Sequence, residues 1–278
     1  MKIYRTKKGI IVEHQNELFL VTDHTWDSFV NRQRLFSAVQ NDLKRLKADP
    51  SLQEFITHQL LTPIGTQEVW ASGVTYLRSR EARMEESKDA GGGDFYARVY
   101  EAARPELFFK APSYRVVGPG DKVRIRRDSK WNVPEPELTL FICSAGSIEG
   151  YTVGNDMSSR DIEGENPLYL PQAKSYDGST SVGPCLFVSE SPIHPDSVIT
   201  LEIKRGGSTA FTNTISINRM KRKHTELAEY LFREVTFPAG TYLMTGTGIV
   251  PPDSFTLQAG DLITISIEHI GTLQNTVA

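Results

Sequence analysis

The sequence predicts an α+β protein that is rich in β-structure and begins with a small α/β domain. Two observations support this fold class. From residue 113 onward, short β-rich runs alternate with Gly, Pro and Asp turns, whereas helical periodicity is concentrated in residues 26–47, 76–103 and 225–235. The 278 residues, 39% hydrophobic and 23% charged, also have an ordinary globular composition, which can bury a sizeable core as one domain or two.

The small N-terminal domain is expected over residues 1–65. The runs "IIVEH" and "LFLVT" predict a strand pair, and residues 26–47 place apolar side chains at three- and four-residue spacing, which predicts a helix. Pro63 and Gly65 then punctuate the chain. We therefore place a domain boundary near residue 65 and a second, larger domain over residues 66–278.

Two charged helical segments, residues 76–87 and 94–103, flank the triple glycine Gly91 to Gly93, which cannot hold a rigid helix together. A mobile lid and a solvated helical hairpin with a flexible turn fit these residues equally well. Later in the chain most of the pattern predicts sheet. One helix over residues 225–235 interrupts it, with Thr225 as the expected N-cap.

Charge and cysteine usage restrict the partners. The formal net charge of −3 gives no whole-molecule attraction to nucleic acid or anionic lipid. The apolar pieces "GIIV" and "LFLV" near the basic start are too short for a secretory core or a membrane span. Cys143 and Cys185 lack zinc-ligand spacing and are expected as buried free thiols. These features favour a soluble cytoplasmic protein whose partner is a small molecule.

The most informative stretch is "WNVPEPELTLF". Because side chains alternate along a strand, Glu135 and Glu137 point to one face, while Leu138 and Leu140 suit a core on the other. A turn near residues 145–147 would bring Asp156 opposite the two glutamates. Three like charges so placed repel one another, and burial makes their ionisation more costly.

A bound cation would resolve this repulsion. A ligand set of carboxylates without Cys or His selects hard cations, so Mg²⁺ or Mn²⁺ is favoured and Ca²⁺ can substitute. The alternative is that the glutamate pair forms a solvated strand edge and that Asp156 is only a turn residue.

Four segments occur in a family-like order: "EPELTL", "NDMSSRD", "KSYDGSTSVGP" and "TGTG". With these motifs the chain resembles the fumarylacetoacetate hydrolase family over roughly residues 67–278. The resemblance implies a catalytic domain of mixed, rolled sheets and a homodimer or homotetramer. It also implies that Glu135, Glu137 and Asp156 bind the metal.

The same resemblance implies that Lys174 and Thr247 contact the substrate, although Gly248 replaces the usual proline after Thr247. The hydrolytic branch of the family carries a water-activating histidine where this chain has Ser79. The segments "GVTYLRSREARMEES" and "PELFFKAPS" resemble instead the 2-keto-3-deoxy-D-arabinonate dehydratase branch, in which a glutamate matching Glu106 serves the chemistry.

The implied activity is a hydro-lyase of pentose catabolism, which converts 2-dehydro-3-deoxy-D-arabinonate to 2,5-dioxopentanoate and water with Mg²⁺. Glu106 and Lys174 would share the proton transfers, and the sequence leaves their division of labour open. Ser79 and Arg80 are further candidates for substrate contact, although an arginine on a charged helix is often solvated. The alternatives are an acylpyruvate-type carbon–carbon hydrolase, an oxaloacetate decarboxylase, and a non-catalytic protein with structural Ca²⁺.

Overall fold

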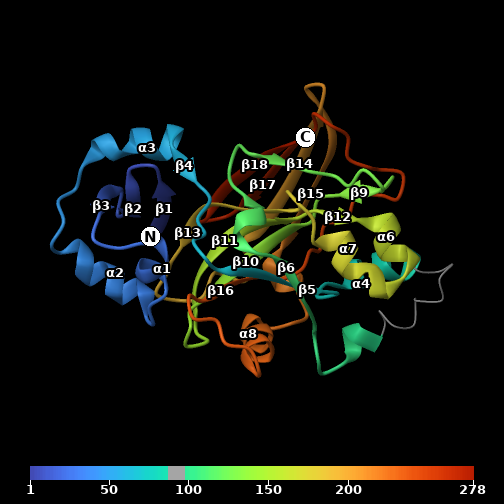
Figure 1. Ribbon diagram of the computed structural model, residues 1–278, viewed down its shortest axis with the longest axis horizontal. Coiled ribbons are helices and arrows are strands. Elements are labelled where there is room, and N and C mark those ends of the chain that lie inside the picture. Colours follow the sequence, from blue (N-terminus) through green and yellow to red (C-terminus); the bar gives the residue numbers. More distant parts are fainter. Residues whose placement is uncertain (87–97) are drawn as a thin grey trace.

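The computed structural model describes residues 1–86 and 98–278 (Figure 1). Gly91 to Gly93, where a mobile lid and a solvated helical hairpin fit the sequence equally well, lie outside the described residues. Among the described residues, no helix is both long and apolar enough to span a membrane. Cys143 and Cys185 are buried free thiols, as predicted.

One large mixed sheet runs through the molecule. Its described strands are β1 (Lys2–Thr6), β2 (Gly9–His14), β3 (Glu17–Val21), β4 (Leu60–Leu61), β5 (Glu68–Gly73), β6 (Glu106–Ala111), β7 (Val116–Val117), β10 (Pro136–Ile142), β11 (Ile148–Asp156), β13 (Thr180–Phe187) and β16 (Thr241–Met244). The main path follows the order β3-β2-β1-β13-β11-β10-β16-β5-β6, with β4 beside β1 and β7 beside β13. Most neighbours are antiparallel, but β16 and β5 are parallel.

A second sheet packs against the first. Its strands follow the order β15 (Ser208–Ser216), β14 (Val198–Arg205), β17 (Leu262–Ile267), β18 (Gly271–Val277) and β8 (Lys122–Val123). Between the two sheets lies an apolar core that includes Leu138, Leu140, Leu201 and Ile265, all at most 1% exposed. A two-stranded sheet joins β9 (Asn132–Val133) to β12 (Ser158–Ser159). The predicted β-rich α+β class is confirmed.

The helices are short and lie around the sheets. They are α1 (Trp26–Val30), α2 (Leu35–Leu43), α3 (Gln53–His58), α4 (Leu77–Glu86), α6 (Arg160–Glu165), α7 (Leu170–Lys174) and α8 (His224–Phe232), with 3₁₀ turns η1 (Pro50–Leu52), η2 (Ser113–Arg115), η3 (Pro167–Tyr169) and η4 (Ile217–Arg219). Figure 1 shows α1 to α3 around β1 to β3 at one end of the molecule, and α4, α6 and α7 gathered at the other. Helix α7 also contacts β6.

The N-terminal strands are continuous with the large sheet, because β1 pairs with β13 through Lys2 and Ile3. The predicted strand pair is present as β2 and β3. The domain boundary near residue 65 stays a prediction.

Two local predictions were wrong. Residues 26–47 form two helices rather than one, because Arg34 adopts a left-handed backbone with φ 53°. The carboxylate of Glu149, on β11, accepts the backbone N–H of Arg34 at 3.2 Å and that of Leu35 at 2.8 Å. Glu149 is far from α2 in the sequence, yet it caps the start of this helix. The local periodicity of residues 26–47 does not predict such a cap.

The predicted N-cap of α8 was also wrong. The helix begins at His224, with Lys223 in the N-cap position, so Thr225 lies inside the first turn. The side chain of Glu226 accepts the backbone N–H of Lys223 at 3.4 Å, which satisfies a donor at the helix start without a hydroxyl cap.

Glu149 connects the strand pair β10–β11 to α2, so its removal should destabilise the fold at this contact. We expect Glu149→Ala to lower the free energy of unfolding by about 1–2 kcal/mol, because two backbone N–H groups lose their acceptor. Urea denaturation followed by circular dichroism measures this change. Glu149→Gln keeps one acceptor oxygen and should lose less. An unchanged midpoint for Glu149→Ala would contradict the proposed link.

Candidate active site

The strand pair β10–β11 brings together the three acidic residues that the sequence singled out. Glu135 and Asp156 face each other directly: the N–H of Glu135 donates to the carbonyl of Asp156 at 3.2 Å, and the N–H of Asp156 donates to the carbonyl of Glu135 at 3.0 Å. The turn between the strands closes at residues 143–147. The predicted hairpin is therefore confirmed, and it juxtaposes the carboxylates.

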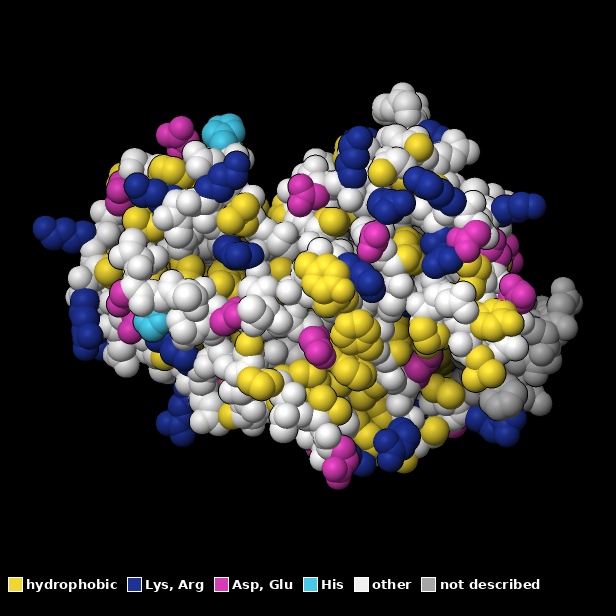
Figure 2. Space-filling view, in the orientation of Figure 1, with side chains coloured by type: hydrophobic (Ala, Val, Ile, Leu, Met, Phe, Trp, Pro, Cys, Tyr) yellow, Lys and Arg dark blue, Asp and Glu magenta, His cyan; other side chains and the backbone are white. Residues whose placement is uncertain are grey.

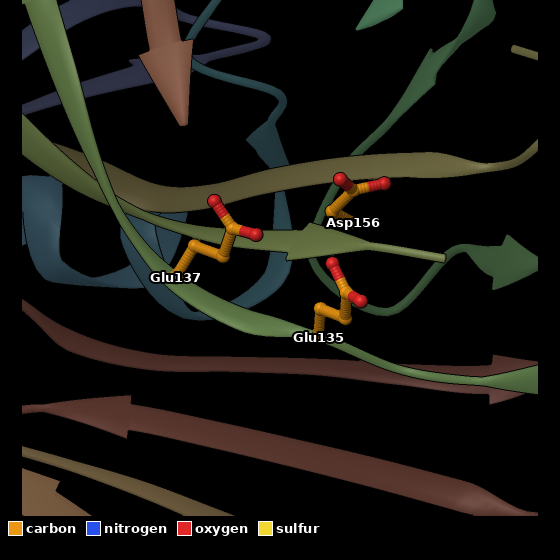
Figure 3. Close-up of side chains that lie close together, drawn as sticks. All are labelled: Glu135, Glu137 and Asp156. Atoms are coloured by element: carbon orange, nitrogen blue, oxygen red, sulfur yellow. The ribbon is translucent and has the colours of Figure 1, made fainter. Parts of the chain in front are cut away.

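The three side chains converge from these two adjacent strands (Figure 3). One carboxylate oxygen from each of Glu135, Glu137 and Asp156 lies within 4.8 Å of the others. Their exposed fractions are only 6%, 1% and 1%. Burial raises the pKa of Glu137 well above its usual range, and the charges of Asp156 and Glu135 raise it further. The triad is thus a concentrated negative site.

Two cationic side chains lie against the triad. Lys174 Nζ is 2.7 Å from Glu135 Oε2, 3.2 Å from Asp156 Oδ2 and 2.6 Å from Ser158 Oγ. Arg160 Nη2 is 2.6 Å from Glu135 Oε1. A fourth buried carboxylate, Glu163, lies 3.5 Å from Arg160 and 3.8 Å from Lys174.

Residues 158–161, which follow Asp156, make two kinds of contact. Ser158 and Arg160 contact the site, whereas the hydroxyl of Ser159 donates to Asn132 at 3.0 Å and Asp161 accepts from Ser129 at 2.6 Å. Two side chains of this segment therefore contact the charged groups of the site, and the other two hold the loop.

Lys110, on β6, is a third cation that the sequence analysis missed. It is 0% exposed, and its Nζ lies 2.6 Å from Asp156 Oδ1. Burial lowers the pKa of Lys110, while Asp156 opposes that shift. A signal was present in the sequence: Glu106, Phe108 and Lys110 alternate along an apolar run, so the lysine shares a face with the candidate catalytic glutamate.

These residues fit a divalent cation. The four buried carboxylates Glu135, Glu137, Asp156 and Glu163 carry four formal negative charges, whereas Lys110, Arg160 and Lys174 carry three positive ones. The buried group is therefore one negative charge in excess before any ligand binds. Oxygen donors alone suit hard ions such as Mg²⁺. Glu135, Glu137 and Asp156 would hold the ion.

A small cavity opens beside the triad. Its wall includes Val74, Phe108 and Gly246 together with three candidate residues, Ser79, Lys174 and Thr247. Val74 is β-branched yet has φ 55°, a left-handed conformation that is rare for its type. Such strained residues often occur at functional sites. Glu135, Asp156 and Lys174 also line this cavity, so two triad carboxylates and the lysine share its wall.

Glu106, the first residue of β6, pairs with Gly73 of β5. A Cβ atom at Gly73 would lie 2.2 Å from Glu106 Oε2, so the side chain of Glu106 packs directly against Gly73. Gly73 lines the cavity, so Glu106 lies next to a residue of the cavity wall, but Glu106 is not itself among the residues that line the cavity. Any larger residue at position 73 would displace the carboxylate of Glu106.

Ser79 and Arg80 occupy different places. The hydroxyl of Ser79 donates to the carbonyl of Tyr76 at 2.8 Å and accepts its N–H at 3.2 Å, so it shapes the start of α4 at the cavity wall. Arg80 is not among the residues that line the cavity. Its guanidinium lies 5.0 Å from the ring centre of Tyr100.

Thr247 lies in the turn that follows β16 and is 3% exposed. Its hydroxyl bonds to the carbonyl and the N–H of Ile249 at 3.2 and 3.1 Å. The preceding residue, Gly246, has φ 90°, and a Cβ there would lie 2.1 Å from Thr75 Oγ1. Its N–H donates to Glu137 Oε2 at 2.5 Å, so this glycine turn holds a triad carboxylate.

The sequence and fold agree with a known family. Residues 69–278 match the family described as the fumarylacetoacetate (FAA) hydrolase C-terminal domain. This match covers most of the chain, and the chain therefore belongs to the fumarylacetoacetate hydrolase family.

Its relatives include dehydratases. It is 44% identical to a probable 2-keto-3-deoxyxylonate dehydratase of Haloferax volcanii, over 90% of this chain and 88% of the relative. It is 45% identical to the 2-dehydro-3-deoxy-D-arabinonate dehydratase of Saccharolobus solfataricus, over 77% of this chain and 73% of the relative.

A solved structure of a 2-keto-3-deoxy-D-arabinonate dehydratase, complexed with magnesium and 2,5-dioxopentanoate, superimposes with a TM-score of 0.83. The two chains are 34% identical, and the match covers 100% of this chain and 98% of the other.

The triad makes a direct prediction about metal binding. We expect Glu137→Gln to abolish detectable Mg²⁺ binding in isothermal titration calorimetry, because an amide keeps the shape of the side chain but removes an anionic ligand. Circular dichroism should show an intact fold. The matched control is Glu165→Gln, the same change at an exposed position of α6, which should bind Mg²⁺ as the unaltered protein does. Normal affinity in Glu137→Gln would rule out this ligand.

Proposed function

We propose that this protein is a hydro-lyase that dehydrates 2-dehydro-3-deoxy-D-arabinonate to 2,5-dioxopentanoate and water, with Mg²⁺ as its cofactor. The observation that carries the proposal is the buried triad of Glu135, Glu137 and Asp156, of which Glu135 and Asp156 line one small cavity together with Lys174. The two dehydratase relatives, at 44% and 45% identity, support the same reaction.

Loss of a proton from C3 and of the hydroxyl from C4 gives water and a 2-oxo-3-ene that still carries a hydroxymethyl group at C5. Transfer of a proton from C5 to C3 then gives the enol of the C5 aldehyde, which tautomerises to the semialdehyde. When bound, Mg²⁺ supplies the Lewis acidity that polarises the 2-oxo acid and makes its C3 protons more acidic. Lys174 Nζ, close to Glu135 and Asp156, is placed to stabilise negative charge or accept the C3 proton. Glu106, next to the cavity wall, would protonate the departing hydroxyl.

Carbon–carbon hydrolysis is the less supported alternative. In the resemblance described above, hydrolytic members carry a histidine where this chain has Ser79. The hydroxyl of Ser79 already bonds to the backbone of Tyr76, and a hydroxyl is a far weaker base than imidazole. The site therefore favours proton transfer within the substrate over activation of an attacking water.

We also propose a homodimer or homotetramer in the cytoplasm. Figure 2 shows hydrophobic side chains gathered over the middle of one face of the molecule. Among the described large apolar residues, Tyr114 is 80% exposed and Leu168 83% exposed, and a contiguous apolar patch on a protein surface commonly marks a protein–protein interface. Light scattering coupled to size-exclusion chromatography should give a mass of two or four chains.

The reaction is tested by incubating the purified protein and Mg²⁺ with 2-dehydro-3-deoxy-D-arabinonate and, separately, with an acylpyruvate. We expect the first substrate to yield the semialdehyde, measured with an aldehyde reagent, and the second to remain intact. Removal of Mg²⁺ with a chelator should stop the reaction. Cleavage of the acylpyruvate without dehydration of the sugar acid would contradict the proposal.

Lys174 has its own expected effect. Aligned donors on a developing anion contribute about 3–4 kcal/mol each, so Lys174→Ala should reduce turnover roughly 100- to 1,000-fold. Steady-state kinetics at saturating Mg²⁺ measures the loss. Lys122→Ala, at an exposed position of β8, is the matched control and should leave turnover unchanged. Near-normal turnover in Lys174→Ala would exclude the lysine from the chemistry.

A further inference from the structure

Lys110 is a fully buried lysine whose ammonium group makes three contacts. Its Nζ lies 2.6 Å from Asp156 Oδ1, donates to the carbonyl of Met157 at 3.0 Å, and donates to the carbonyl of Lys174. An ammonium group has three N–H donors and no acceptor. The ammonium group thus donates hydrogen bonds to two carbonyls and forms an ion pair with the carboxylate of Asp156, and these oxygens suit the charged form of the side chain.

These contacts connect separate parts of the site. Asp156 and Met157 lie at the end of β11, and Lys174 is the last residue of α7. Lys110 itself lies on β6, whose first residue is Glu106. One ammonium group thus joins the strand that carries a candidate metal ligand, the helix that carries the candidate catalytic lysine, and the strand that carries the candidate catalytic glutamate.

The contact with Asp156 also fixes the orientation of its carboxylate. Lys110 engages Oδ1, whereas Oδ2 faces Lys174 Nζ at 3.2 Å, on the side of the triad. A carboxylate held by one oxygen can rotate little about its side-chain bonds. The ion pair with Lys110 therefore engages Oδ1, and Oδ2 shares the Lys174 ammonium group with Glu135 Oε2.

We infer that Lys110 is a positioning residue of the metal centre, which holds Asp156 in a one-oxygen binding geometry and fixes the backbone of Lys174 beside it. The expected change in kcat rests on the proposed function. The expected change in Mg²⁺ affinity does not, because it concerns only the candidate metal ligand Asp156. Lys110 does not line the cavity, and it acts through the two residues that do.

A purely structural role is the competing explanation, because loss of a buried charged partner usually destabilises the fold. Two substitutions separate the roles. Lys110→Met keeps the length and apolar stem but removes the charge and all donors. Lys110→Gln removes the charge but keeps two N–H donors for the carbonyls, and it serves where the methionine variant folds poorly.

The control is Tyr242→Phe. Tyr242 is fully buried on β16, and its hydroxyl donates to the carbonyl of Pro63. This variant loses a buried hydrogen bond without touching the site. It should lower the melting temperature while leaving Mg²⁺ affinity and kcat unchanged.

The measurements are the Mg²⁺ dissociation constant by calorimetry without substrate, and kcat and KM at saturating Mg²⁺. We expect both Lys110 variants to raise the dissociation constant about 10- to 100-fold, as loss of a group that orients a ligand does. We also expect kcat of Lys110→Met to remain reduced at saturating Mg²⁺, because the carbonyl of Lys174 loses its donor, and kcat of Lys110→Gln to fall less because an amide N–H can replace that donor.

A folded Lys110 variant with an unchanged or lower dissociation constant for Mg²⁺ would overturn the inference. A different result would mark failure of the proposed function: the unaltered protein would bind Mg²⁺ but not dehydrate the sugar acid. In that case the raised dissociation constant of the Lys110 variants would still support the positioning role.

Discussion

The site depends on one constraint, which is the burial of three carboxylates on adjacent strands. Strand pairing sets Asp156 opposite Glu135, and the alternation of side chains adds Glu137 on the same face. Water is largely excluded, so the repulsion among them must be balanced from within the protein or by a bound ion. The surrounding cations Lys110, Arg160 and Lys174 follow from this need.

The balance also explains why the site suits its proposed ligands. With Glu163 included, the buried group carries one more negative than positive charge. A divalent cation reverses that sign and leaves one positive charge, which a substrate monocarboxylate can neutralise. In the proposed function the same residues would hold the metal and favour an anionic partner, and Lys174 and Glu106 would carry out the proton transfers.

Local rules predicted the centre of the site well, because the hairpin depends on short-range alternation and one tight turn. The acidic face, the apolar face of Leu138 and Leu140, and the return of Asp156 all follow from the local sequence. What failed depended on distant contacts. Glu149 interrupts the predicted long helix from across the molecule, and Lys110 acquires its role only when β6, β11 and α7 meet. The assignment of Arg80 to the substrate and the boundary near residue 65 stay predictions.

The central claim is that the triad binds one divalent ion through all three carboxylates. Anomalous diffraction from a crystal soaked in Mn²⁺, an ion with the same oxygen preference and a measurable signal, tests it most directly. The account predicts a single strong peak in contact with an oxygen of Glu135, of Glu137 and of Asp156. A map without a peak at the triad, with Lys174 still bridging Glu135 and Asp156, would contradict it.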